Sequence, residues 1–117
     1  LIGHAYKLAL ASKVCLQLNT KDIPLLNGAY DLAELGCLPG ACFRNQEFVE
    51  EFCHFGDEVV YEHKMLIHDA QTSGGLLMCV PKESVNKVLE DLKNSVYSHS
   101  AVIGEVKAKG EFLVEVC

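Results

Sequence analysis

The spacing of apolar residues predicts alternating helices and strands along the chain. Apolar residues three and four positions apart indicate helices, whereas strict alternation or a short unbroken apolar run indicates strands. In the first part we expect a helix over residues 1–13, a strand over 14–18, a polar connection over 19–24, a helix over 26–35 and a loop over 37–45. In the second part we expect an aromatic, helix-spaced stretch over 46–55, a short helix over 58–68, a strand over 76–80, a helix over 81–94 and a hairpin of strands over 101–107 and 111–116. This order predicts an α+β fold, with helices packed on a mixed, partly antiparallel sheet.

The run from Leu76 to Val80 is the most apolar of the predicted strands. It is too short for an independent helix, and Pro81 closes it. Apolar residues on both faces predict a strand that is covered on both sides, deep in the sheet. The polar stretch Asp69–Gly75 leads directly into this run. The sequence therefore predicts a flexible polar loop at the mouth of a central strand, a common place for ligand sites in α/β proteins.

Two interpretations of this loop follow from its residues alone. In the first, Thr72 and Ser73 bond to local backbone in an ordinary turn, and Gly74 and Gly75 provide positive φ or allow a close backbone approach. In the second, Gln71 and the two hydroxyls donate to an anion, while the glycines let backbone amides reach it. The GxxxxGK[ST] motif of a P-loop is absent. The loop is thus a candidate anion site, with a plain turn as the alternative.

A second candidate lies in the expected loop around Pro39 and Gly40. Arg44 suits a phosphate contact, although a solvated or internally paired arginine is the alternative, and Asn45 stands next to it. The aromatic residues that follow have helical spacing, and we expect them to belong to the core; they are Phe48, Phe52 and Phe55.

Composition narrows the classes of function. The 117 residues suit one domain and half of them are apolar, while 16 acidic against 10 basic residues give a charge of −6. The sequence has no basic stripe of the kind that binds nucleic acid. It also has no apolar run long enough to span a membrane. The six cysteines form no CxxC pair, so we expect no metal site. A half-apolar chain of this size does not need disulfides to fold, so we expect reduced thiols in the cytoplasm. A metal held by Cys42, Cys53 and His54 is the weaker alternative.

Three separated stretches resemble, in order and spacing, the carboxy-terminal half of the selenide, water dikinase (selenophosphate synthase) family, within the aminoimidazole-ribonucleotide-synthetase-like superfamily. They are Leu1–Ala5, Pro39–Asn45 and Asp69–Leu77. The resemblance covers essentially the whole chain, and its stretch from Gln71 to Gly75 is the most specific. Ala70 and Ala41 depart from the family, which usually has proline and glycine at these positions.

The resemblance implies that residues 1–117 form a single carboxy-terminal domain of a longer two-domain enzyme, whose ATP-binding amino-terminal domain precedes Leu1. Such enzymes make selenophosphate, AMP and phosphate from ATP, selenide and water with Mg²⁺. Their reactive cysteine or selenocysteine and their metal-binding aspartates lie outside the matching residues. The resemblance therefore implies that these residues include no catalytic residue and no metal ligand. It implies that ATP and Mg²⁺ bind to the whole parent enzyme and not to this fragment alone. It also implies that the parent enzyme is a homodimer. The candidates that it leaves for phosphate or substrate contact are Asp69, Gln71, Thr72, Ser73, Gly74, Gly75, Arg44 and Asn45.

Two other functions stay open. One is another ATP-dependent enzyme of the same superfamily, and the other is a non-catalytic ligand-binding or dimerisation module. The stretch from Gln71 to Gly75, placed after the Pro39–Asn45 stretch, favours the selenium enzyme. We also expect the helical stripe of Leu1, Ala5 and Leu8 to pack against the preceding domain.

Overall fold

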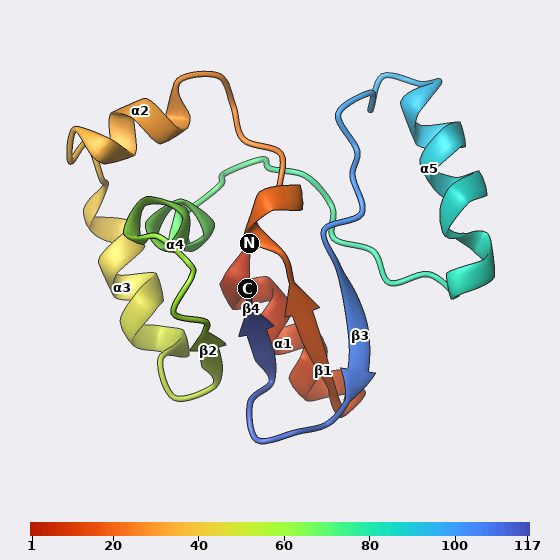
Figure 1. Ribbon diagram of the computed structural model, residues 1–117, viewed down its shortest axis with the longest axis horizontal. Coiled ribbons are helices and arrows are strands. Elements are labelled where there is room, and N and C mark those ends of the chain that lie inside the picture. Colours follow the sequence, from red (N-terminus) through yellow and green to blue (C-terminus); the bar gives the residue numbers. More distant parts are fainter.

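The computed structural model describes all of residues 1–117, and a four-stranded sheet of order β2-β4-β1-β3 forms its centre (Figure 1). The strands are β1 (Val14–Leu18), β2 (Cys53–Phe55), β3 (Gly104–Ala108) and β4 (Val114–Val116). Strand β4 runs parallel to both β1 and β2, whereas β3 runs antiparallel to β1. This mixed sheet with its helices confirms the predicted α+β class.

The chain has five α-helices: α1 (Ile2–Ser12), α2 (Ala29–Glu34), α3 (Gly40–Val49), α4 (Tyr61–His68) and α5 (Val85–Lys93). Short 3₁₀ turns stand at Thr20–Asp22 and Lys82–Ser84. Helix α1 lies against β1 and β4, and α4 packs against both α2 and α3 on the β2 side (Figure 1). None of these helices is long and apolar enough to cross a membrane.

The apolar side of α1 is part of the chain's own core. Ile2, Ala5 and Ala9 are almost fully buried, at most 1% exposed, and Leu1 and Leu8 pack against the same cluster. The expectation that Ala5 and its stripe lie open for another domain is therefore wrong. The spacing identified the helix correctly, but the strands β1 and β4 that cover it come from both ends of the chain.

Helix α3 replaces most of the expected loop over residues 37–45. Pro39 precedes the first helical residue with φ −64° and ψ 145°, so proline here starts a helix and does not mark a continuing loop. Arg44 therefore lies on a helix and not in a loop.

The aromatic stretch over residues 46–55 is divided between three settings. Phe48 ends up 52% exposed near the end of α3, Phe52 stacks on Tyr6 with ring centroids 4.6 Å apart, and Phe55 belongs to β2. Phe52 and Phe55 pack against the core as expected, whereas Phe48 does not. A single helix over this stretch is ruled out, because residues 53–55 pair with β4.

The predicted hairpin does not form, because β1 lies between β3 and β4. Strand β4 pairs with β1 and β2, which buries Val114 and Val116. Long-range burial therefore overrides the local turn signal at Lys109 and Gly110.

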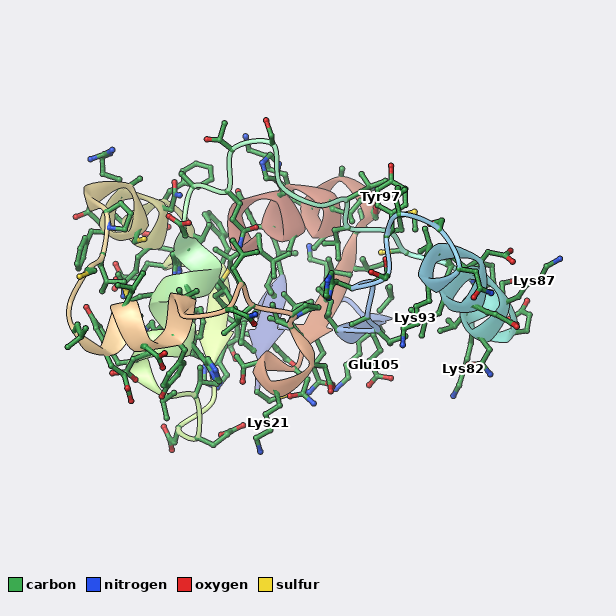
Figure 2. All side chains as sticks on the ribbon, turned by 90° about the horizontal axis from the view of Figure 1, so that it is seen from above. Lys21, Lys82, Lys87, Lys93, Tyr97 and Glu105 are labelled. Carbon is green, nitrogen blue, oxygen red and sulfur yellow. The ribbon has the colours of Figure 1, made fainter.

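The predicted central strand over residues 76–80 is also wrong for this structure. The segment has no sheet partner, and Leu76 is 84% exposed. It runs as an extended connection from the helical side of the molecule to α5, which stands away from the other helices (Figures 1 and 2). Figure 2 shows Lys82 and Lys87 on this outlying part of the molecule.

Candidate functional site

The Asp69–Gly75 loop begins at the end of α4 and contains one tight turn. The Gly74 amide donates to the Gln71 carbonyl over 3.0 Å, which closes a four-residue turn. Ser73 occupies its third position with φ 55°, the arrangement of a type II turn, where glycine is usual. A serine in this left-handed region indicates that the turn is held by its surroundings.

The two glycines of the loop have different roles. Neither has positive φ, so the expectation that they provide it is wrong. A Cβ on Gly74 would lie 2.9 Å from the Gln71 carbonyl oxygen, whereas a Cβ on Gly75 would meet no atom within 4 Å. Gly74 therefore permits a close approach of backbone to backbone, as the alternative expectation had it.

The loop uses some of its own donors and leaves others free. The Gln71 amide donates to the Asp69 carbonyl over 3.0 Å, and the Thr72 amide donates to the Ala70 carbonyl over 2.8 Å. The amides of Ser73 and Gly75 have no partner in the chain, and neither has the Ser73 hydroxyl. Exposed neutral donors of this kind suit the oxygens of a phosphate.

Side chains from α3 hold the base of the loop. The Cys42 thiol donates to Asp69 Oδ1 over 3.7 Å, and the Asn45 side-chain amide donates to the His68 carbonyl over 2.7 Å. Burial, together with the charge of Asp69, raises the pKa of the Cys42 thiol. Cys42 is therefore a protonated donor to Asp69 and not a thiolate nucleophile.

The other candidates divide clearly. The backbone nitrogen of Leu1 donates to Gln71 Oε1 over 3.4 Å, so the beginning of α1 contacts the loop. Arg44 is exposed, forms no ion pair and makes no hydrogen bond to the loop. The structure thus brings Asn45, but not Arg44, into contact with the residues that carry the loop.

Sequence reasoning missed His68, which directly precedes Asp69. It is 1% exposed, its Nδ1–H donates to the Lys64 carbonyl, and its Nε2 has no partner. Its ring lies 5.4 Å from that of Phe55. Burial is the main cause that lowers the pKa of His68, so its neutral form is favoured. The available signal was its spacing of three from Met65 on the buried side of α4.

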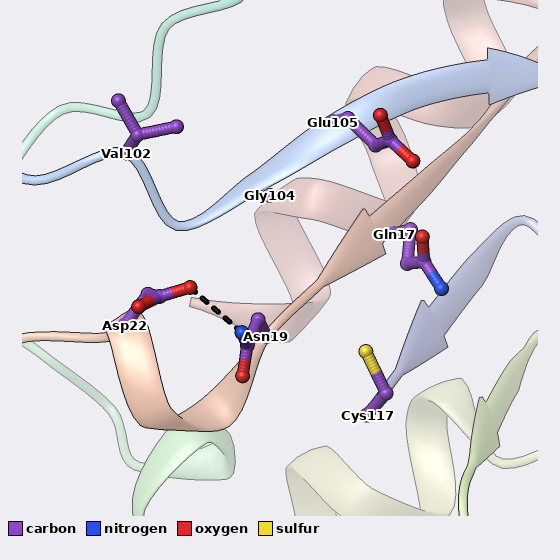
Figure 3. Close-up of a pocket in the computed structure, with 7 residues that line it drawn as sticks. All are labelled: Gln17, Asn19, Asp22, Val102, Gly104, Glu105 and Cys117. Atoms are coloured by element: carbon purple, nitrogen blue, oxygen red, sulfur yellow. Dashed lines mark hydrogen bonds between the residues drawn. The ribbon is translucent and has the colours of Figure 1, made fainter.

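Apart from the loop, a polar cavity of about 300 Å³ lies where β1 and β4 end (Figure 3). Asn19 donates to Asp22 over 2.7 Å at its rim, and Glu105 faces it from β3. Two carboxylates and no cationic side chain line this cavity, so it does not suit an anion such as phosphate. The chain has no group of three or more His, Cys, Asp or Glu side chains close enough together to hold a metal ion. Cys42, Cys53 and His54 therefore do not form the metal site considered as an alternative.

Comparison with known proteins gives the class. Residues 1–117 match the family model of the AIR synthase related protein, C-terminal domain. Because this match covers the whole chain, the chain belongs to that family.

The chain is also similar to proteins named selenide, water dikinase. It is 42% identical to the one from Porphyromonas gingivalis (strain ATCC 33277) over 105 residues, which are 89% of this chain and 30% of that protein. It is 36% identical to the one from Caldanaerobacter subterraneus subsp. tengcongensis over 124 aligned positions, and the alignment covers 99% of this chain and 33% of that protein. For Clostridioides difficile (strain 630) the identity is 30% over 116 residues, with the same two shares of 99% and 33%. The chain thus spans about a third of the length of these curated relatives.

Proposed function

We propose that the chain is the carboxy-terminal domain of a selenide, water dikinase, a two-domain enzyme that makes selenophosphate, AMP and phosphate from ATP, selenide and water. The observation that carries the proposal is similarity over nearly the whole chain to several relatives of this one name. The family match alone would also admit other ATP-dependent enzymes of the superfamily. We further propose that the enzyme is a cytoplasmic homodimer.

In this proposal the Asp69–Gly75 loop forms a wall of the active site and positions phosphate oxygens. Its free donors are the amides of Ser73 and Gly75 and the Ser73 hydroxyl, with Gln71 and Thr72 beside them. Asp69 orients the loop through its bond with Cys42. Asn45 supports the same base through His68, and Arg44, free of ion pairs, contributes a positive charge from α3.

The chain's residues fit the phosphates of ATP better than they fit Mg²⁺. Phosphoryl transfer requires charge neutralisation by metal ions and cationic groups as well as positioning. Asp69 is the one carboxylate of the loop, and it already accepts a hydrogen bond from Cys42. A magnesium ion supplies charge neutralisation in the whole enzyme, and we assign its ligands to the amino-terminal domain. This chain then binds and orients phosphate without a catalytic residue of its own.

The test is an assay of the whole enzyme that carries this chain. We expect ATP to be converted to AMP only when selenide is present, with selenophosphate detected by ³¹P NMR. The isolated 117-residue chain should form no AMP above a boiled control. AMP formation by the isolated chain would contradict the division of roles between the domains. Conversion of ATP to ADP that depends on an aminoimidazole precursor and not on selenide would identify another member of the superfamily.

A further inference from the structure

His68 is a buried polar side chain with only one of its two ring nitrogens bonded. It is 1% exposed, and its Nδ1–H donates to the Lys64 carbonyl. The other nitrogen, Nε2, lies away from solvent and has no hydrogen-bond partner. In this tautomer Nε2 carries a lone pair and only accepts hydrogen bonds. Buried polar atoms nearly always have a partner, either a protein group or an ordered water, so the Nε2 of His68 needs an explanation.

A small cavity borders the same side chain. It has a volume of about 40 Å³ and is lined by residues of α3, β2 and α4, which lie together on the β2 side of the molecule (Figure 1). One water molecule needs roughly 10–15 Å³ of space. Pockets for organic ligands begin at roughly 300 Å³. The size of the cavity therefore suits a water molecule and no larger ligand.

The walls of the cavity provide further hydrogen-bonding groups. Gln46 lines it from α3 with a side-chain amide that both donates and accepts, and Cys53 lines it from β2 with a thiol. Burial raises the pKa of the Cys53 thiol to about 12, so this thiol keeps its proton and is a weak donor. A buried water typically makes about three hydrogen bonds. Together with Nε2 of His68, the amide and the thiol supply that number.

We propose that this cavity is a binding site for one long-lived water molecule, which donates a hydrogen bond to His68 Nε2 and bridges it to the side chains of Gln46 and Cys53. The water joins α4 to α3 and β2. Asn45 already donates to the His68 carbonyl, so neighbouring residues of α3 hold the backbone of His68 directly and its ring through the water. Because His68 precedes Asp69, the water also helps to fix the position where the candidate loop begins. This site is independent of the proposed function.

The competing arrangement contains no water. In it, the side-chain amide of Gln46 turns and donates directly to Nε2 of His68, and the cavity is dry. Two observations favour the water. Nε2 has no protein partner although Gln46 lines the same cavity, and cavities lined by polar groups hold water, whereas dry cavities are apolar.

Crystal structures of the whole enzyme that carries this chain test the site directly. In the unaltered enzyme we expect an ordered water at about 2.7–3.2 Å from Nε2 of His68. His68→Phe keeps an aromatic ring but removes the acceptor, so this water should be lost. The matched control on the same helix is His63→Phe, because the His63 ring packs on Tyr30 and does not line the cavity. It should keep the water. A dry cavity in the unaltered enzyme, or a direct bond from Gln46 to Nε2, would overturn the proposal.

A solution measurement provides a second test that leaves His68 in place. Oxygen-17 magnetic relaxation dispersion reports the residence times of internal waters. Gln46→Leu removes one partner of the water and should shorten its residence time roughly fivefold, the factor that corresponds to one lost hydrogen bond. The adjacent Glu47→Leu is the control, because Glu47 is exposed and does not line the cavity. Equal residence times in the two variants would overturn the proposal.

Discussion

The side-chain amide of Asn45 donates a 2.7 Å hydrogen bond to the carbonyl of His68. The last carbonyls of a helix have no intrahelical partner, so this bond satisfies one of them at the end of α4. It joins α3 to the residue that directly precedes Asp69. The position at which the candidate loop begins therefore depends on a residue 23 positions earlier in the chain.

We predict that Asn45→Ala lowers the free energy of unfolding by about 1–2 kcal/mol, because a partly buried carbonyl loses its donor. The neighbouring change Arg44→Ala is the control, and it should stay within about 0.5 kcal/mol, since Arg44 is exposed and unpaired. Urea denaturation of both variants measures the difference. Equal midpoints would show that the Asn45 bond adds nothing to stability.

The two loop glycines should respond differently to the same substitution. Gly74→Ala places a methyl group 2.9 Å from the Gln71 carbonyl oxygen and should cost about 1–3 kcal/mol of stability. Gly75→Ala meets open space and has no positive φ, so it should change stability by less than about 0.5 kcal/mol. Thermal melting of the pair provides the comparison, and a smaller loss for Gly74→Ala than for Gly75→Ala would contradict the turn described above.

Ser73 combines a strained backbone with an available hydroxyl. Ser73→Gly should raise the free energy of unfolding by up to about 1 kcal/mol, because glycine adopts φ 55° without a Cβ penalty. The same variant should lose activity in the whole enzyme if the hydroxyl binds phosphate. A gain in stability with loss of turnover would separate the two roles, and a loss of stability would contradict the assigned conformation.

Thr72→Val and Ser73→Ala test the loop as a phosphate site. In the whole enzyme we expect each to slow turnover roughly tenfold to a hundredfold, because a donor that acts mainly in the transition state is lost. Melting temperatures should not change, since both residues are exposed. Turnover and ATP affinity equal to those of the unaltered enzyme would leave the loop as a structural turn.

Stability should fall in mildly acidic solution because of His68. Its folded pKa lies below the usual 6.5, chiefly through burial, so the unfolded chain takes up a proton before the folded chain does. The contribution of His68 is therefore fully present above about pH 6.5 and declines as the pH falls below that value. His68→Gln should flatten this part of the profile of unfolding free energy against pH. The exposed His99→Gln is the control, and an equal effect of both changes would rule out a special role for His68.

The local elements of the first strand and of α1 and α4 were predictable because their spacing and their burial agree. The failures share a physical cause. The residues around Lys109 and Gly110 are typical of a turn, but Val114 and Val116 are buried between β1 and β2 and do not pair with β3. Similarly, a short apolar run such as residues 76–80 indicates a strand without naming its neighbour.

The site was predictable in position but not in detail. The loop's polar composition identified Asp69–Gly75, whereas the hydrogen bonds that hold it come from α3 and from the beginning of the chain. The buried His68 gave only a weak signal, because a histidine on a helix is usually exposed or partly exposed. Contacts across many residues of separation determine these details, and local patterns do not contain them.

The place of β4 in the sheet bears on when the molecule can fold during synthesis. Strands β1 and β2 are both neighbours of β4 and not of each other. While Val114–Val116 is still inside the ribosome, the nascent chain cannot join β1 and β2 into one sheet. Until then, the apolar side of α1 has no complete sheet to cover, and a chaperone that binds apolar helices would find this surface accessible. Assembly of the core is thus a late event, set by the appearance of three residues.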